Sequence, residues 1–71
     1  MESLATDPQL RVLFHQLNNQ LGVVLAHAEL LEAKSSDAVH RARAEQVVKG
    51  VLEAMGTAKE IRRCSEAQAA A

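Results

Sequence analysis

Residues 10–31 read LRVLFHQLNNQLGVVLAHAELL, and their pattern predicts a helical fold. Its apolar side chains recur in alternating steps of four and three residues, which is the heptad pattern of helices that pack along their length against other helices. We therefore expect a long amphipathic helix with one apolar seam. The seam positions are Leu10, Phe14, Leu17, Leu21, Val24, Ala28 and Leu31.

The start of this helix is marked by the residues just before the seam. Asp7 can accept hydrogen bonds from the free N–H groups of the first turn, and Pro8 suits the first helical position because its missing N–H needs no partner there. Thr6 with Gln9 forms an alternative capping box. The sequence predicts the first helix over about residues 7–34.

A short polar break separates this helix from a second one. Residues 35–37 read Ser-Ser-Asp, and these side chains favour turns and helix N-caps because they bond to nearby backbone. We expect a second helix over about residues 37–64, a frayed tail over residues 65–71 and a frayed lead-in over residues 1–6. The apolar positions of the second helix are Ala44, Val47, Val48, Val51, Leu52, Ala54, Met55, Ala58 and Ile61.

The two helices are expected to form one small domain that dimerises. So short a connection makes neighbouring helices antiparallel. The chain has 71 residues and a single cysteine, Cys64, so neither an internal disulfide nor a zinc-type cluster is available to stabilise it. Each helix carries an apolar stripe broader than one neighbour can cover. We predict an all-α antiparallel two-helix hairpin over residues 1–71 that forms a homodimeric four-helix bundle.

Composition excludes several classes of partner. The formal net charge is −1 and there is one aromatic residue, so the chain has neither the basic surface nor the stacking platform of a nucleic-acid binder. No apolar run approaches the roughly 20 residues that span a bilayer, and the N-terminus lacks the basic region of a signal peptide. We expect a cytoplasmic protein that binds no nucleic acid, no membrane, no metal and no cofactor of its own.

His15 is the residue with the clearest chemical potential. It follows a seam position by one residue, so it is expected at the edge of the buried stripe, where a partner can reach it. An accessible imidazole on a rigid helix can act as a nucleophile or proton carrier, although an exposed helical histidine with no role is the alternative. Residues of the same face, one or two turns away, are Arg11, Asn18, Asn19 and Gly22.

Residues 15–31, HQLNNQLGVVLAHAELL, resemble the H-box of the dimerisation and histidine-phosphotransfer domain of two-component sensor histidine kinases. They are also similar to the sporulation phosphotransferase type, which uses a like helical hairpin without being a kinase. The resemblance covers the first helix closely, whereas residues 44–63 match only as a generic second bundle helix. It implies that His15 exchanges a phosphoryl group with an aspartate of a response-regulator receiver domain, which supplies its own Mg²⁺.

The resemblance also assigns roles to the neighbours of His15. Asn19 matches the family's Asn or Thr position, and Gln20 stands where a related subfamily has a comparable glutamine. The resemblance implies that these carboxamides orient water for dephosphorylation of the receiver, a phosphatase activity that is secondary to phosphotransfer. Arg11, Gln16, Asn18 and Gly22 form the expected docking surface. Gln16 departs from the family, which has an acid there, and a carboxamide takes up no proton at neutral pH.

Two functions therefore remain open. The first is a phosphotransfer module that does not phosphorylate itself from ATP, since the acid after His15 is missing and no Gly-rich phosphate loop exists in the sequence. The second is a non-catalytic dimeric interaction module that binds a histidine kinase or a response regulator. The chain could also be an excised piece of a larger kinase, but Met1 and the capped first helix favour a complete product.

Overall fold

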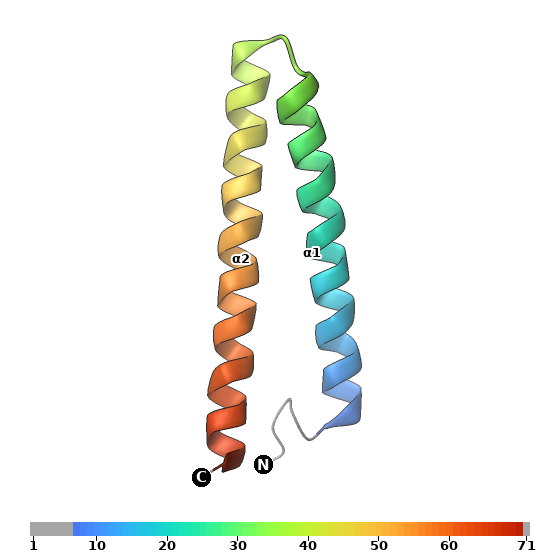
Figure 1. The fold of residues 1–71 in the computed structure, drawn as a ribbon, viewed down its shortest axis with the longest axis vertical. Helices are drawn as coiled ribbons and strands as arrows, with labels where there is room; N and C mark the ends of the chain where they lie inside the picture. Colours follow the sequence, from blue (N-terminus) through green and yellow to red (C-terminus); the bar gives the residue numbers. More distant parts are fainter. Residues whose placement is uncertain (1–6, 71) are drawn as a thin grey trace.

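A computed structural model describes residues 7–70 as two long α-helices joined by a short loop (Figure 1). Helix α1 spans Pro8–Lys34 and helix α2 spans Ala38–Ala70. The helices run antiparallel, so the beginning of α1 and the end of α2 lie at the same end of the molecule (Figure 1). No strand occurs within residues 7–70. The predicted all-α antiparallel hairpin is confirmed.

Helix α1 begins at the predicted cap. The carboxylate of Asp7 accepts hydrogen bonds from the backbone N–H groups of Gln9 and Leu10, at 2.9 and 3.2 Å, and Pro8 occupies the first turn. These bonds satisfy donors that have no partner inside the helix. The alternative capping box of Thr6, like the lead-in over residues 1–6, lies outside the described residues.

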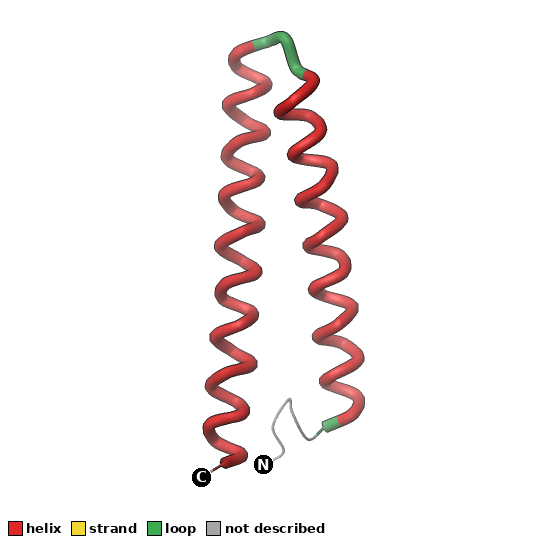
Figure 2. The backbone as a smooth tube through the Cα atoms, viewed as in Figure 1, coloured by secondary structure: helices red, strands yellow, loops and turns green. Residues whose placement is uncertain are grey.

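The loop over residues 35–37 joins the helices (green in Figure 2). The Ser35 hydroxyl donates a hydrogen bond to the carbonyl oxygen of Asp37, at 3.3 Å. The Asp37 carboxylate accepts bonds from the backbone N–H groups of Val39 and His40, at 2.8 and 3.2 Å, and so caps α2. The polar break therefore both ends α1 and begins α2, as its residue types predict.

Helix α2 is longer than the sequence interpretation allowed. The sequence predicts an end near residue 64 and a frayed tail over residues 65–71, whereas the helix continues to Ala70; residue 71 lies outside the described residues. Two physical reasons account for the difference. Alanine, which is frequent in this segment, has the highest helix propensity of any residue. In addition, the Arg62 Nε donates to the Glu66 carboxylate across one helical turn, at 3.2 Å.

The hairpin is a rod one helix thick. Its extents are 51 × 18 × 12 Å, and the smallest of these matches the diameter of a single helix with its side chains, about 10–12 Å. The radius of gyration is 15.8 Å, compared with about 11 Å for a compact chain of this length. Within the described part of the chain no large side chain is fully buried. A single hairpin therefore has almost no interior.

The predicted seam is divided between two directions. Alternate seam positions on α1 face α2 and are buried or half-buried; we name these the inner stripe of α1: Phe14, Leu21 and Ala28. The remaining seam positions turn to one side of the hairpin, where Leu10 is half-buried and the others are exposed. We name these the open stripe of α1: Leu10, Leu17, Val24 and Leu31.

Helix α2 repeats this division with the same seven-residue spacing. Its buried positions form the inner stripe of α2: Ala44, Val51 and Ala58. Its exposed positions on the same side as the open stripe of α1 form the open stripe of α2: His40, Val47, Ala54 and Ile61. The two open stripes together make up the open face of the hairpin.

Apolar packing, rather than polar pairing, joins the two helices. In the part of the chain that the structure describes, each ion pair links residues three or four positions apart, and none links α1 to α2. The charged group that does reach across is the Arg62 guanidinium, which lies 5.8 Å from the ring centroid of Phe14. Such a contact at an exposed site is worth about 0.5–1 kcal/mol. Apolar side chains between the helices therefore supply most of the contact energy.

Candidate functional site

His15 lies on the side of the hairpin opposite the open face. It is exposed, as its position beside the seam predicts. In a helix, each residue is turned about 100° from the one before, so Val24 and Leu17 of the open stripe point about 160–180° away from His15. We name the side that carries His15 the His15 face. No part of the apolar open stripe shares this face with the imidazole.

The imidazole of His15 has no competing partner. Among residues 7–67, no side chain makes a hydrogen bond or ion pair with it. Both ring nitrogens are therefore open to an incoming group. A neutral imidazole in this state presents one nitrogen lone pair as a nucleophile. The rigid helix α1 fixes the position of its Cα, so a partner meets the imidazole at a defined place on the helix.

Four of the predicted site residues share the His15 face. Gly22 is almost in line with His15, about 20° away around the helix, while Asn18 and Asn19 are about 60° and 40° away, and Arg11 is about 40° away. Asn18 and Gly22 are half-buried, and Asn19 and Arg11 are exposed. A Cβ added to Gly22 would meet no atom within 4 Å. The helix thus brings a polar surface with an open centre next to the imidazole.

Two predicted site residues lie elsewhere on α1. Gln20, five positions after His15, is turned about 140° away from it and lies at the border of the open face, next to Leu17 and Val24. Gln16 is turned about 100° away and is exposed on the outer side of the helix. Helical geometry therefore brings Asn19, but not Gln20, onto the same surface as His15.

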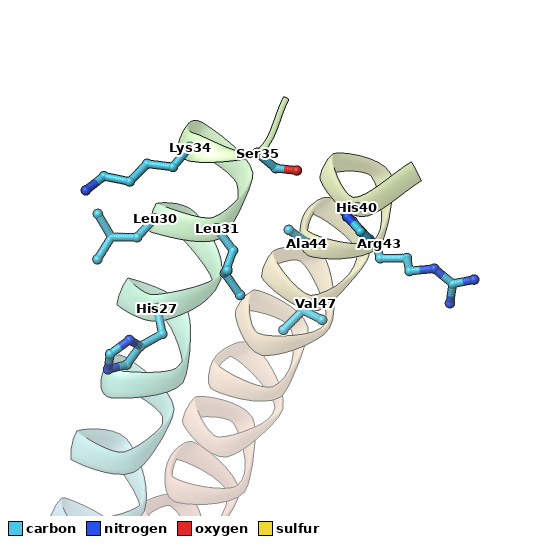
Figure 3. A pocket seen from close by; sticks show the side chains of 9 residues that line it. All are labelled: His27, Leu30, Leu31, Lys34, Ser35, His40, Arg43, Ala44 and Val47. Atoms are coloured by element: carbon cyan, nitrogen blue, oxygen red, sulfur yellow. The ribbon is translucent and has the colours of Figure 1, made fainter. Parts of the chain in front are cut away.

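The open face is hollowed into apolar grooves along its length. One of them lies next to the loop and has a volume of about 580 Å³ (Figure 3). Figure 3 shows Leu31 and Val47 reaching toward each other from the two helices, while Lys34 and Arg43 extend outward on opposite sides. A second groove continues past Val24, and another lies at the far end of the hairpin. Residues lining that far groove are Leu10, Leu13, Phe14, Leu17, Ala58 and Ile61.

The sequence interpretation did not identify these grooves. It treated the seam as one stripe, whereas the seven-residue spacing within the seam was the signal that could have separated an inner from an open half. The grooves are lined by residues of both helices, so they depend on how α1 and α2 are rotated against each other. That rotation is a tertiary property, and periodicity within one helix does not specify it.

Within residues 7–70, no three side chains of His, Cys, Asp or Glu are arranged to hold a metal ion. Cys64 is a free, exposed thiol. Neither described helix combines the length and the apolar character needed to cross a bilayer.

Comparison of the chain with protein-family models, with curated proteins and with solved structures found no match. The function must therefore be inferred from the residues themselves and from their arrangement along α1.

Proposed function

We propose that this protein is a two-component signalling module in which His15 accepts a phosphoryl group from, or passes it to, an aspartate of a response-regulator receiver domain. It acts in the cytoplasm as a homodimeric four-helix bundle and does not phosphorylate itself from ATP. The observation that carries the proposal is an exposed, unpaired imidazole on a rigid helix, within a stretch that resembles the H-box.

The chemistry requires little from this chain beyond position. When the receiver is the donor, a lone pair of the His15 imidazole attacks phosphorus in line with the aspartyl oxygen. The N–P bond forms as the P–O bond breaks, the aspartate carboxylate leaves with the electron pair, and the ring N–H proton passes to water. Receiver-bound Mg²⁺ neutralises the charge that develops on the phosphoryl oxygens. Transfer in the opposite direction reverses these steps.

The polar residues on the His15 face support partner docking. Asn18 and Asn19 can each donate and accept hydrogen bonds without titrating, and Gly22 leaves room for the approach of a partner's backbone. Arg11 provides a cation one turn before His15, where it can contact phosphate or the acidic surface of a receiver. Gln20, which lies at the border of the open face, is not assigned to this docking surface.

Phosphorylation of His15 is tested by transfer from partner proteins. The wild-type chain is incubated with phosphorylated receiver domains, or with a histidine kinase catalytic domain and ATP, and acid-labile, base-stable phosphate is measured. We expect label on the wild type and on His27→Ala, but none on His15→Ala. Because His15 is exposed and unpaired, its replacement should leave the helical circular dichroism unchanged. Equal labelling of His15→Ala would refute the proposal.

A second candidate function is supported by Gln16. In the family that the sequence resembles, this position carries an acid, and its loss removes the group that orients or deprotonates the imidazole. The chain would then be a non-catalytic interaction module that occupies the docking surface of a kinase or a response regulator. Binding of a receiver or kinase that survives His15→Ala, together with no phosphate on the wild type, would favour this function.

A further inference from the structure

The open face leaves half of each helical seam uncovered. Leu17, Val24 and Leu31 on α1 are 43%, 45% and 65% exposed, and Val47 and Ile61 on α2 are about as exposed. Contiguous apolar surfaces of this kind on a soluble chain mark sites of protein association. The outer sides of the helices also carry exposed aliphatic residues, such as Val12, but these do not join into a groove shared by both helices.

We propose that a second copy of this chain covers the open face, with the two open stripes of one hairpin packed against those of the other. This inference rests on the dimer of the proposed function and is independent of phosphotransfer. It adds the surface through which the dimer forms. The residues at the interface are those of the open stripes, Leu10, Leu17, Val24 and Leu31 on α1 with His40, Val47, Ala54 and Ile61 on α2.

The spacing of the open stripes identifies the partner as a helical pair of the same kind. On both helices the open positions repeat every seven residues over almost the full length of the hairpin, in register with the inner stripes. A helix with a sustained seven-residue repeat packs best against helices that carry the same repeat over a similar length. In a four-helix bundle, each helix turns one set of seam positions to one neighbour and the other set to a second neighbour. A second hairpin supplies that missing neighbour.

The size of the open face suits a stable dimer. A face of 51 × 18 Å has a projected area of roughly 900 Å², close to the ~800 Å² that each partner contributes to a standard protein interface. The same association would double the thickness of a molecule that measures only 12 Å in its smallest extent. It would give the side chains of the inner and open stripes a common interior.

The charge distribution also suits self-association. No acidic residue lines any of the three grooves described above. The cations Lys34 and Arg43 belong to the groove next to the loop, and both extend outward from it (Figure 3). The middle of the open face, around Val24 and Val47, is therefore uncharged. Depletion of charge in the middle of the contact area is typical of homodimer interfaces.

This arrangement keeps both His15 side chains accessible. Because the open stripe of α1 points about 140–180° away from His15, a second hairpin on the open face covers neither imidazole. Each dimer then presents two separate His15 faces on its outside. Association and partner docking use opposite sides of the same helix.

A matched pair of charge substitutions on α1 tests the surface. Val24→Glu introduces a carboxylate into the open stripe, and Val12→Glu introduces the same group on the outer side of α1, where Val12 is 56% exposed. By sedimentation equilibrium at pH 7, we expect wild type and Val12→Glu to dimerise, and Val24→Glu to raise the dimer dissociation constant by at least about 100-fold. A monomeric wild type, or equal effects of the two substitutions, would overturn the proposal.

A second test strengthens the interface and does not depend on a destabilised variant. His40 is the polar member of the open stripe of α2, so His40→Leu should lower the dissociation constant by about tenfold or more, because two leucines become buried per dimer. The control Gln46→Leu adds the same side chain on the outer side of α2 and should leave the dissociation constant unchanged. Equal tightening by both variants would indicate non-specific association and would contradict the assignment.

The wild-type interface can also be observed directly. In a mixture of isotope-labelled and unlabelled chains, intermolecular nuclear Overhauser effects are expected at the methyl groups of Leu17, Val24 and Val47. Effects confined to Val12 and Leu52, which lie on other sides of the hairpin, would overturn the proposed surface. A dimer confirmed in this way with no phosphate on His15 would retain the interface and refute phosphotransfer alone.

Discussion

Replacing Gly22 with alanine should make the protein more stable and its phosphotransfer slower. In the middle of a helix, glycine costs roughly 0.5–1 kcal/mol relative to alanine, because the glycine backbone loses more conformational freedom on folding. Nothing in the structure requires glycine at this position. A Cβ built on Gly22 meets no atom within 4 Å, and no described glycine has a positive φ. The full gain in helix propensity should therefore be realised.

Gly56 provides the matched control. It lies in the interior of α2, and a Cβ built on it also meets no atom within 4 Å, so Gly56→Ala should give a similar gain. Each substitution should raise the midpoint of thermal unfolding by about 2–8 °C, since ~1 kcal/mol corresponds to about 4–8 °C in a domain of this size. Because the two sites are on different helices, the double variant should show about the sum of the two gains. Protein concentration must be held constant, because dimerisation also contributes to the measured stability.

The functional readout separates the two glycines. Gly22 lies almost in line with His15 on the proposed docking surface, where an added methyl group meets an approaching receiver, whereas Gly56 lies on the other helix. We expect Gly22→Ala to lower the rate of transfer from a phosphorylated receiver several-fold and Gly56→Ala to leave it unchanged. Destabilisation by either substitution in urea unfolding would refute the packing argument. Equal transfer rates in the two variants would refute the docking role of Gly22.

Three further predictions test the cap, the core and the altered position after His15. Asp37→Ala removes the acceptor of two backbone N–H groups at the start of α2 and should lower the free energy of unfolding by about 0.5–2 kcal/mol in urea titrations. Val51 is only 8% exposed, so Val51→Ala should lower the free energy of unfolding by about 1.5–2.5 kcal/mol, from two lost methylene equivalents and the cavity that remains. Val12→Ala, at an exposed position, should change the free energy of unfolding by no more than about 0.5 kcal/mol. Gln16→Glu restores a proton acceptor beside His15 and should speed labelling by a kinase catalytic domain with ATP at least about tenfold; an unchanged rate would exclude that role for the acid.

The elements that the sequence predicted correctly depend on local chemistry. Asp7 and Asp37 cap the two helices through their own side chains, and the break at residues 35–37 contains residue types that end helices anywhere. The exposure of His15 followed from its place next to a seam position. These predictions needed no knowledge of how the two helices meet, because each concerns a residue and its neighbours along one helix.

The elements that the sequence did not predict depend on how the helices meet. Periodicity shows that Phe14 and Leu17 lie near one side of α1, but not that one contacts α2 while the other remains open. The contact between the helices uses small residues, with Ala28, Ala44 and Ala58 all buried. The interaxial distance of packed helices depends on the side chains at the contact, and small side chains allow close approach. A single hairpin therefore buries only part of the apolar surface that its two helices carry.

Gln20 is a second case, at the candidate site, in which the sequence did not specify where a side chain lies in space. A match in residue identity grouped Gln20 with His15, although five helical steps turn the two side chains about 140° apart. At that angle Gln20 borders the open face, where a polar carboxamide among aliphatic side chains can fix the register of a helical interface at some cost in stability. If the second hairpin packs as proposed, Gln20→Leu should change dimer affinity and leave phosphoryl transfer at His15 intact. Asn19→Ala should instead leave dimer affinity unchanged and alter phosphoryl transfer at His15. The one helix then serves two purposes on opposite sides, association through its aliphatic residues and phosphoryl exchange through its imidazole.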